Sequence, residues 1–325
     1  MSERNGVESG ANHNGRDARS WVGIAANARS GLGSGRRRVA HLVKALRRQG
    51  LRSKIAWTPE DRAGLVAEAA TDRRCRCLVA AGGDGTVAAL INERPAVPLT
   101  VLSAGTENLF ARHFGLRGGP RLVAEAIAAG RVARIDLGRA DGRRFSLMAG
   151  IGFDAEVVTR HHEARVGLAG VARPTHRAAY VEPILRASLS YRFPPLTVTV
   201  ADPGREEVLV GTTAFVFNLP SYALGLPLAP TAVADDGLLD LVVFRDAGPF
   251  RALHYLWLAL RGLHLSRPDV HHRRVAHVLV STTVPVPFQL DGDPGGVVDP
   301  GAGQAPWSID VLPAAVDIVV PPSYG

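Results

Sequence analysis

Apolar residues over positions 21–130 follow two periods in turn. Near-continuous apolar runs, which are typical of buried strands, lie at 21–27, 75–81 and 98–104. The segment after the first run places Val39, Leu42 and Leu46 on one face of a helix that ends at Gly50. The alternation continues with a strand near 51–57 and helices near 59–71, from about Thr86 and at 120–130. Strands alternating with helices predict an α/β domain built on a doubly wound parallel sheet.

The pattern changes after about Ile135. Short β-rich runs separated by Gly, Pro and Asp predict a second, β-rich domain with an antiparallel, sandwich-like sheet. Helical segments near 156–190 and 250–265 interrupt it, and the Gly/Pro-rich stretch 293–306 is interpreted as a long flexible loop. The predicted division is a disordered leader at 1–20, an α/β domain at 21–135, a β-rich domain at 136–310, and a strand and tail at 311–325, for which a return to the first domain is open.

Composition and charge narrow the classes of partner. A composition of 46% hydrophobic and 21% charged residues is typical of a globular protein. The formal net charge of +8 predicts attraction to anions such as nucleotide phosphates, nucleic acid or an acidic lipid surface. The sequence has no zinc-finger, helix-turn-helix or RNP signature, so we expect no nucleic-acid partner.

Two further features bear on the location of the protein. The cysteines, Cys75 and Cys77, are poorly placed for an intrachain disulfide, which favours a reducing, cytoplasmic setting. The sequence contains no run of 18 consecutive apolar residues that would span a membrane. Any membrane contact is therefore expected to be peripheral.

Glycines, a carboxylate and a threonine lie together between a strand and a helix, at Gly82, Gly83, Asp84, Gly85 and Thr86. Glycines let backbone amides approach a phosphate closely, and the start of a helix adds a favourable dipole. A carboxylate beside phosphates is understandable if it reaches Mg²⁺ or the water shell of that ion. The spacing fits neither the P-loop nor the Rossmann fingerprint, so this loop alone predicts a phosphate site without naming an enzyme class.

Together with other segments, this loop resembles the diacylglycerol kinase catalytic-domain superfamily, which includes bacterial diacylglycerol kinases and sphingosine kinase-like lipid kinases. The segments occur in the family's order over about residues 21–320: NARSGLG from Asn27, Thr58 ahead of a helix, GGDGT, SAGTENLFARHFGL, AGIGFDAEVV, DDGLLDLVVF and FQLDGDP. The resemblance implies a kinase that transfers the γ-phosphoryl group of ATP, with Mg²⁺, to a lipid hydroxyl, diacylglycerol-like or sphingoid-like. The first domain would bind the nucleotide and the second the lipid.

The resemblance also implies roles for single residues. The ATP site would be lined by Asn27, Thr58, Gly82, Gly83, Asp84, Gly85, Thr86, Gly105, Thr106 and Asn108. Asp236, with the backbone carbonyls of Val233 and Leu238, would hold a structural Mg²⁺. Asp84 would contact the nucleotide or the catalytic Mg²⁺. Asp291 and Asp293 are the candidates for the general base, because phosphoryl transfer needs a carboxylate that orients the attacking hydroxyl.

Alternatives remain open at this point. Asp-Gly in FQLDGDP is also a type I′ hairpin signal, and the family's Asp-Gly-Glu is Asp-Gly-Asp here, which leaves open whether Asp291 or Asp293 acts. An NAD kinase shares the GGDGT loop and the two-domain plan. A nucleotide- or lipid-binding protein without turnover is the third hypothesis, because Glu107 adds negative charge near the predicted cleft. Sheet edges in the second domain would permit a homodimer.

The segment 250–265 bears on how a lipid would be reached. Its residues Phe250, Leu253, Leu256, Trp257 and Leu260 lie along one side of a helix. An apolar stripe of this spacing usually faces a protein core, which is our expectation here. The alternative is a helix that dips into the headgroup layer of a membrane, assisted by basic residues.

Overall fold

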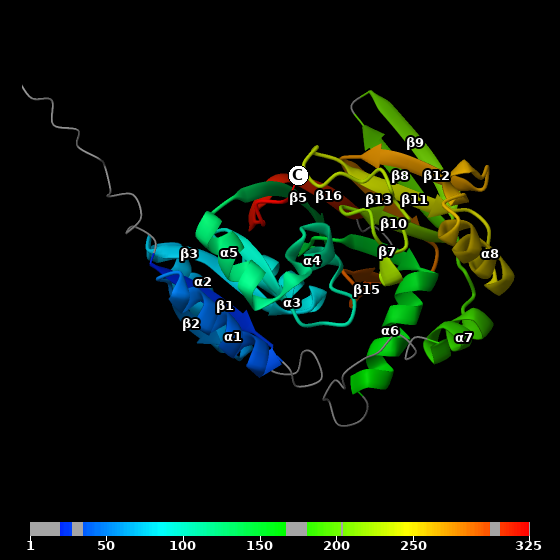
Figure 1. Cartoon of the computed structure of the whole chain (residues 1–325). Coiled ribbons are helices and arrows are strands. Elements are labelled where there is room, and N and C mark those ends of the chain that lie inside the picture. Colours follow the sequence, from blue (N-terminus) through cyan, green and yellow to red (C-terminus); the bar gives the residue numbers. More distant parts are fainter. Residues whose placement is uncertain (1–19, 28–34, 167–180, 203, 300–305, 325) are drawn as a thin grey trace, which may run out of the picture.

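The first sheet forms from the predicted apolar runs. The computed structural model describes residues 20–27, 35–166, 181–202, 204–299 and 306–324, and strands alternate with helices over its first part (Figure 1). These elements are β1 (Trp21–Ala26), α1 (Gly35–Arg48), β2 (Arg52–Ala56), α2 (Pro59–Thr71), β3 (Cys75–Gly82), α3 (Asp84–Asn92), β4 (Leu99–Ser103), α4 (Leu109–His113), α5 (Pro120–Ala129) and β5 (Val132–Ala140).

The strands β2, β1, β3 and β4 lie in that order and are parallel. All residues of β1 are buried, as expected for a strand covered on both faces. Helices α1 and α5 pack on each other, and α2 and α3 lie against β1 and β3. The carboxyl ends of β1, β3 and β4 therefore meet at one edge of the sheet, where parallel sheets commonly bind ligands.

The later part of the chain forms an antiparallel sandwich. Its elements are β6 (Arg143–Phe145), β7 (Met148–Gly152), α6 (Phe153–Val166), α7 (Val181–Ser190), β8 (Leu196–Asp202), β9 (Arg205–Gly211), β10 (Thr213–Phe217), β11 (Leu239–Phe244), α8 (Pro249–Leu260), β12 (Val270–Val275), β13 (His277–Thr282), β14 (Val286–Leu290) and β15 (Asp293–Val298). Within the described residues, six strands form one sheet in the order β12-β11-β10-β7-β14-β15. Its inner face packs on β8 and β13 through a shared core. The predicted fold class is confirmed.

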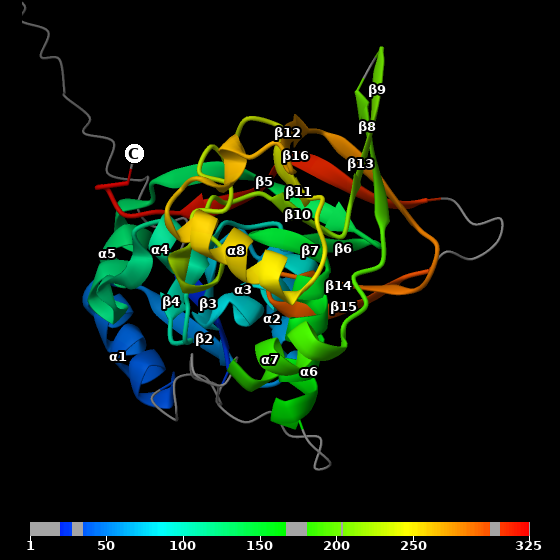
Figure 2. The same cartoon turned by 90° about the vertical axis from the view of Figure 1, so that its right-hand side faces the viewer.

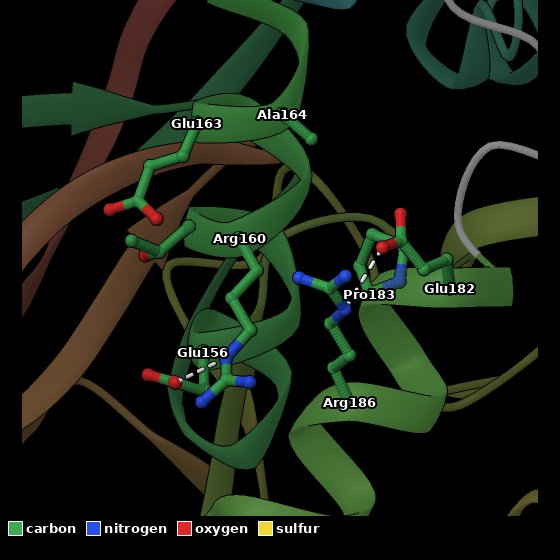
Figure 3. A pocket seen from close by; sticks show the side chains of 8 residues that line it. Glu156, Arg160, Glu163, Ala164, Glu182, Pro183 and Arg186 are labelled. Carbon is green, nitrogen blue, oxygen red and sulfur yellow. Dashed lines mark hydrogen bonds and ion pairs between the residues drawn. The ribbon is translucent and has the colours of Figure 1, made fainter. Parts of the chain in front are cut away.

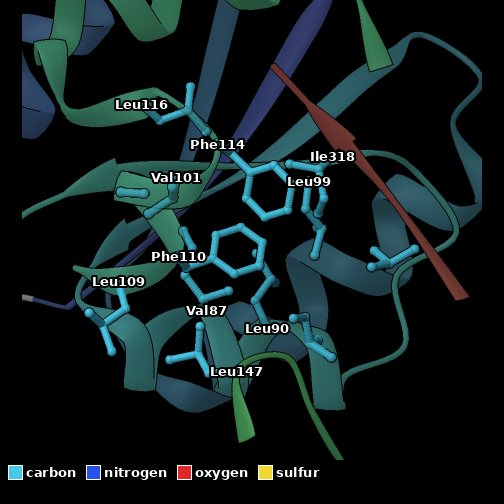
Figure 4. Close-up of a cluster of buried hydrophobic side chains, with 14 of the residues drawn as sticks. Val87, Leu90, Leu99, Val101, Leu109, Phe110, Phe114, Leu116, Leu147 and Ile318 are labelled. Carbon is cyan, nitrogen blue, oxygen red and sulfur yellow. The ribbon is translucent and has the colours of Figure 1, made fainter. Parts of the chain in front are cut away.

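One long strand, β16 (Trp307–Val319), connects the two parts of the molecule. Its first residues pair with β13, its length pairs with β5, and Ile318 lies parallel to Leu99 of β4. The Thr100 hydroxyl donates to the carbonyl of Val319 over 3.0 Å. Figure 4 shows Ile318 in the same buried cluster as Phe110. The C-terminal strand is thus part of the first domain's core.

Two expectations of the sequence analysis are wrong. The stretch 293–306 is not a loop throughout, because 293–298 form β15, whose Gly295 lies so close to the Phe288 ring that a side chain would collide with it. The stripe on 250–265 does not face the core: Phe250 is 86% exposed (Figure 2 shows α8 beside α7). Parts of other predictions lie outside the described residues, namely the leader apart from Ser20, residues 167–180 of a predicted helical segment, and 300–305.

The aromatic core predicts a contrast between two phenylalanines. Replacing Phe110, which is 1% exposed, by Ala should lower the free energy of unfolding by about 3–5 kcal/mol, because a cavity opens between α4 and the sheet. Replacing Phe250, at 86% exposure, should change it by less than about 0.5 kcal/mol. Urea denaturation followed by circular dichroism measures both. Equal losses for the two variants would contradict the assigned core.

Candidate active site

The glycine turn after β3 touches the loop after β4. The amide of Ala104 donates to the carbonyl of Gly82 over 2.8 Å. A Cβ on Gly105 would lie 2.6 Å from the Cα of Gly83, closer than any side chain tolerates. Glycine is therefore required where the two predicted nucleotide loops meet, and the contact brings their backbone amides together at the carboxyl edge of the sheet.

Asp84 and Asn108 hold these two loops in place. The Asp84 carboxylate accepts hydrogen bonds from the amides of Leu109 (3.1 Å) and Phe110 (3.0 Å) at the start of α4. The Asn108 side chain accepts from the amide of Gly105 and donates to its carbonyl, over 2.8 and 2.6 Å. Burial raises the pKa of Asp84, and the two amides oppose that shift. The side chains predicted to touch the nucleotide thus also fix the loop geometry.

The segment FQLDGDP forms a tight hairpin between β14 and β15. Asp291 and Gly292 have φ angles of 53° and 84°, as a type I′ turn requires. The Asp291 carboxylate is buried and accepts hydrogen bonds from the amides of Ser146 (2.8 Å), Leu147 (2.7 Å) and Met148 (3.0 Å), and from the Ser146 hydroxyl (3.1 Å). This carboxylate therefore anchors the hairpin to the chain segment that leads into β7.

The anchored turn brings Asp293 to the glycine loop. A Cβ built on Gly85 would lie 3.2 Å from Oδ2 of Asp293. Gly85 belongs to the first turn of α3, where backbone amides point outward and the helix dipole favours negative charge. A carboxylate beside such a turn can accept a proton from a hydroxyl while the amides hold an anionic group.

Sequence reasoning missed a buried network behind this carboxylate. Oε1 of Gln289 accepts a hydrogen bond from the amide of Gly292 over 2.8 Å, and its Nε2 donates to Oδ2 of Asp154 over 2.9 Å. The Tyr222 hydroxyl donates to the other oxygen of Asp154. Burial raises the pKa of Asp154, and both hydrogen bonds oppose the shift. The available signal was a lone polar residue inside an apolar run, such as Gln289 in VPFQL, because buried polar groups need partners.

The other predicted nucleotide residues are placed as follows. Asn27 is exposed directly after β1, and its amide donates to the carbonyl of Ala81 over 3.1 Å, so it adjoins the end of β3. Thr58 is the N-cap of α2, and its hydroxyl accepts from the amide of Asp61 over 3.1 Å. Thr106 is exposed on the loop after β4. The structure brings Asn27 near the glycine turn, whereas the hydroxyl of Thr58 caps a helix.

The residues around Asp236 do not fit the predicted structural Mg²⁺. One carboxylate oxygen accepts from the amide of Leu238 over 3.0 Å, and the other is paired with Arg274. Across the described ranges no group of three or more His, Cys, Asp or Glu side chains could hold a metal ion. Val233 lies in an exposed turn that is tied instead to Asp136, whose Oδ2 accepts from the amide of Gly237 over 2.7 Å. A guanidinium therefore neutralises the carboxylate that a cation would need.

A cavity of about 470 Å³ lies between α6 and α7 (Figure 3). Ion pairs within each helix line it, Glu156 with Arg160 at 2.6 Å and Glu182 with Arg186 at 2.9 Å. None of the predicted site residues lines this cavity. Its charged walls suit water or a polar group better than an acyl chain.

Comparisons with known proteins agree with the architecture of this site. Residues 22–140 match the family model "Diacylglycerol kinase catalytic domain", and residues 148–320 match "YegS C-terminal NAD kinase beta sandwich-like domain". A diacylglycerol kinase of Mycobacterium tuberculosis is 30% identical over 262 residues, which are 78% of this chain and 79% of the relative. A diacylglycerol kinase of Bacillus subtilis is 27% identical over 284 residues, 84% of this chain and 89% of the relative.

The fold itself is found among solved structures. A Bacillus anthracis structure described as a candidate diacylglycerol kinase superposes with a TM-score of 0.72 at 21% identity, covering 97% of this chain and 99% of that one. At this identity the likeness establishes the arrangement of strands and helices.

Asp291 predicts a pH-dependent term in stability. Burial raises its pKa from 3.8 to about 6, although its hydrogen bonds from backbone amides act to lower the pKa. The folded state then binds the proton more tightly than the unfolded state, so this contribution is complete below pH 3.8 and is lost as the pH rises through about 6. Between these limits the parent should lose about 3 kcal/mol of unfolding free energy relative to Asp291→Asn. Urea titrations of both proteins at several pH values measure the difference, and a pH-independent offset would contradict the assigned burial.

Proposed function

Because the chain belongs to the bacterial diacylglycerol kinase-like lipid kinases, we propose that it transfers the γ-phosphoryl group of ATP to the hydroxyl of a diacylglycerol-like or sphingoid-like lipid. The observation that supports this most directly is the position of Asp293 beside Gly85. It joins a carboxylate of the β-rich domain to the glycine turn of the α/β domain. A two-substrate reaction requires such a junction, because the hydroxyl and the phosphate must meet in line.

In the proposed reaction the lipid hydroxyl oxygen attacks the γ-phosphorus. A new O–P bond forms, the bond from the γ-phosphorus to the β–γ bridging oxygen breaks, and ADP leaves. Asp293 accepts the hydroxyl proton. The first-turn amides of α3 hold phosphate oxygens, whose negative charge they stabilise.

Asp291 has a different role in this proposal. Its oxygens accept hydrogen bonds from the amides of residues 146–148, so it positions the turn. The carboxylate that accepts the hydroxyl proton is then Asp293. Asp84 likewise holds α4 against α3 and keeps lone pairs for a cation. Asp84 and Asp293 adjoin Gly85 from two sides, and Mg²⁺ prefers one or two carboxylates together with phosphate oxygens, so these residues fit a nucleotide-bound ion. When bound, Mg²⁺ supplies neutralisation of phosphate charge.

The enzyme would be cytoplasmic and would bind membranes peripherally. It would meet its lipid acceptor at the membrane surface. No helix in the described part of the chain is both long and apolar enough to cross a membrane. The NAD kinase alternative is not favoured, because the curated relatives reported above are diacylglycerol kinases over most of the chain.

The proposal predicts which carboxylate carries activity. Asp293→Asn should lower kcat by about 10²–10⁴-fold, because the amide cannot accept the hydroxyl proton. The matched control is Asp299→Asn, an exposed carboxylate just after the same strand, which should change kcat less than about twofold. The measurement is transfer of labelled γ-phosphate from ATP with Mg²⁺ to diacylglycerol, sphingosine or NAD, the lipids being presented in mixed micelles.

The outcomes of this assay separate the hypotheses. Phosphorylation of one lipid by the parent and the control, with loss in Asp293→Asn, supports the proposal and identifies the acceptor. Product from NAD alone would establish the NAD kinase alternative. Bound ATP with no product from any acceptor would support the non-catalytic hypothesis.

The junction at Gly85 makes a second prediction. Gly85→Ala should lower kcat by about tenfold or more with little change in stability, because its methyl group would press on Oδ2 of Asp293 at 3.2 Å and move the carboxylate. Gly64→Ala is the matched control, since a Cβ there meets nothing within 4 Å. Steady-state kinetics and thermal unfolding of both variants measure the contrast. Full activity in Gly85→Ala would mean that Asp293 does not need its observed position.

A further inference from the structure

Helix α8 exposes its apolar side to solvent. Phe250, Leu253, Trp257 and Leu260 are 86%, 56%, 47% and 65% exposed, and Leu256 is 43% exposed. The side that packs on the protein is narrow, consisting of Tyr255, Leu258 and Ala259. Ordinary surface helices show the reverse arrangement, with polar residues outward. The exposed apolar residues therefore form one continuous face, which we call the α8 face.

Helix α8 itself carries basic side chains and no acidic one, and Arg251 at its start pairs with Asp246, just before the helix, at 3.4 Å. The segment from Pro249 to Ser266 contains no Asp or Glu. Arg261 lies over the Trp257 ring at 4.8 Å from its centroid, and His254 stacks on the same ring at 6.1 Å. The side chain of Arg251 is 51% exposed. Cations beside an exposed indole match the boundary between acyl chains and anionic headgroups, where Trp and Arg are favoured.

An aromatic row connects α8 with the candidate active site. Tyr255 packs on Phe244 (4.8 Å between ring centroids), Phe244 on Phe215 (6.1 Å), and Phe215 on Tyr222 (5.5 Å). Tyr222 donates to Asp154, whose partner Gln289 holds the turn before Asp293. Helix α8 and the network behind Asp293 therefore lie on the same side of the β10–β11 sheet.

We propose that the α8 face docks this enzyme on an anionic lipid bilayer, with Phe250, Leu253, Trp257 and Leu260 inserted at the headgroup level and Arg261 contacting an anionic headgroup. The proposal rests on the proposed function for its purpose, since a lipid kinase must reach an acceptor in a membrane. Leu189 is also 86% exposed, on α7, a helix that contacts α8.

The charge pattern favours a bilayer over a second copy of the chain. An isologous pairing of two α8 faces would bring the same arginines and histidine together without an acidic partner on either helix, and like charges repel. An anionic bilayer instead provides an apolar acyl-chain region that the leucines can enter and phosphate groups that the cations can contact.

The test is sedimentation of the full chain with vesicles of phosphatidylglycerol and phosphatidylcholine in equal parts, compared with pure phosphatidylcholine. The parent should bind the anionic vesicles more tightly. The triple variant Phe250→Ser, Leu253→Ser, Leu260→Ser should lower the partition coefficient at least about tenfold, because three large apolar groups no longer enter the bilayer. The matched control, Val208→Ser with Val210→Ser, replaces exposed valines of β9 (57% and 52% exposed) and should bind like the parent.

A charge variant tests the second part of the proposal. Arg261→Gln should weaken binding to anionic vesicles about fivefold at low salt, and the difference should shrink as salt screens the charges. Its matched control is Arg121→Gln on α5, a side chain that is 91% exposed. Equal binding of parent and triple variant, or equal loss in the valine control, would overturn the proposal.

Two further readouts separate this proposal from its alternatives. Turnover of a short-chain, water-soluble acceptor should be the same in the triple variant and the parent, because the α8 face does not touch Asp293. An inactive parent that still binds anionic vesicles through α8 would overturn the proposed function and leave the docking surface in place. A parent that is dimeric in solution, ignores vesicles, and becomes monomeric in the triple variant would assign the α8 face to a second copy and overturn the docking proposal.

Discussion

The arrangement of the site depends on one buried carboxylate. Asp291 accepts hydrogen bonds from three consecutive amides at 146–148, and this contact sets where the β14–β15 hairpin lies on the six-stranded sheet. Asp293 follows two residues later, so the hydrogen bonds of Asp291 also help to fix the position of Asp293 beside Gly85. Three donors on one carboxylate offset much of the cost of burying it. The ladder between β14 and β7 holds the strand in the sheet, and the Asp291 carboxylate additionally fixes the turn at its end.

The other half of the site depends on close backbone contact. Gly83 and Gly105 lie so near each other that position 105 accepts no side chain, and Asp84 and Asn108 then tie the two loops by hydrogen bonds. The glycines in GGDGT thus bring two loops together in addition to leaving room for phosphates. Because β16 pairs with β4 and with β13, one sheet continues from the α/β domain into the sandwich, and the six-stranded sheet that carries Asp293 packs on it.

Local patterns predicted the fold, but not which atoms of a side chain already have hydrogen-bond partners. Strand and helix periods are local properties, and the order of motifs identified the family. Whether Asp291 or Asp293 faces the nucleotide depends on which amides lie opposite the hairpin, and those belong to residues 146–148, far away in sequence. The pairing of Asp236 with Arg274 was unpredictable for the same reason, because Arg274 comes from β12, the strand that pairs with β11. The Gln289 network also required tertiary partners that spacing alone does not give.

Helix α8 shows that an apolar stripe in the sequence does not by itself determine whether the stripe faces the core or the solvent. Periodicity predicts that one face is apolar, and the usual inference that this face is buried rests on the cost of exposing it to water. Here Tyr255, Leu258 and Ala259 already fill the contact with the rest of the protein, so the wider apolar face is left outside. That exposure is costly for a protein surrounded by water and favourable for one that lies on a bilayer. The sequence carries this information in Arg261, a cation that lies over the Trp257 ring at the edge of the apolar side.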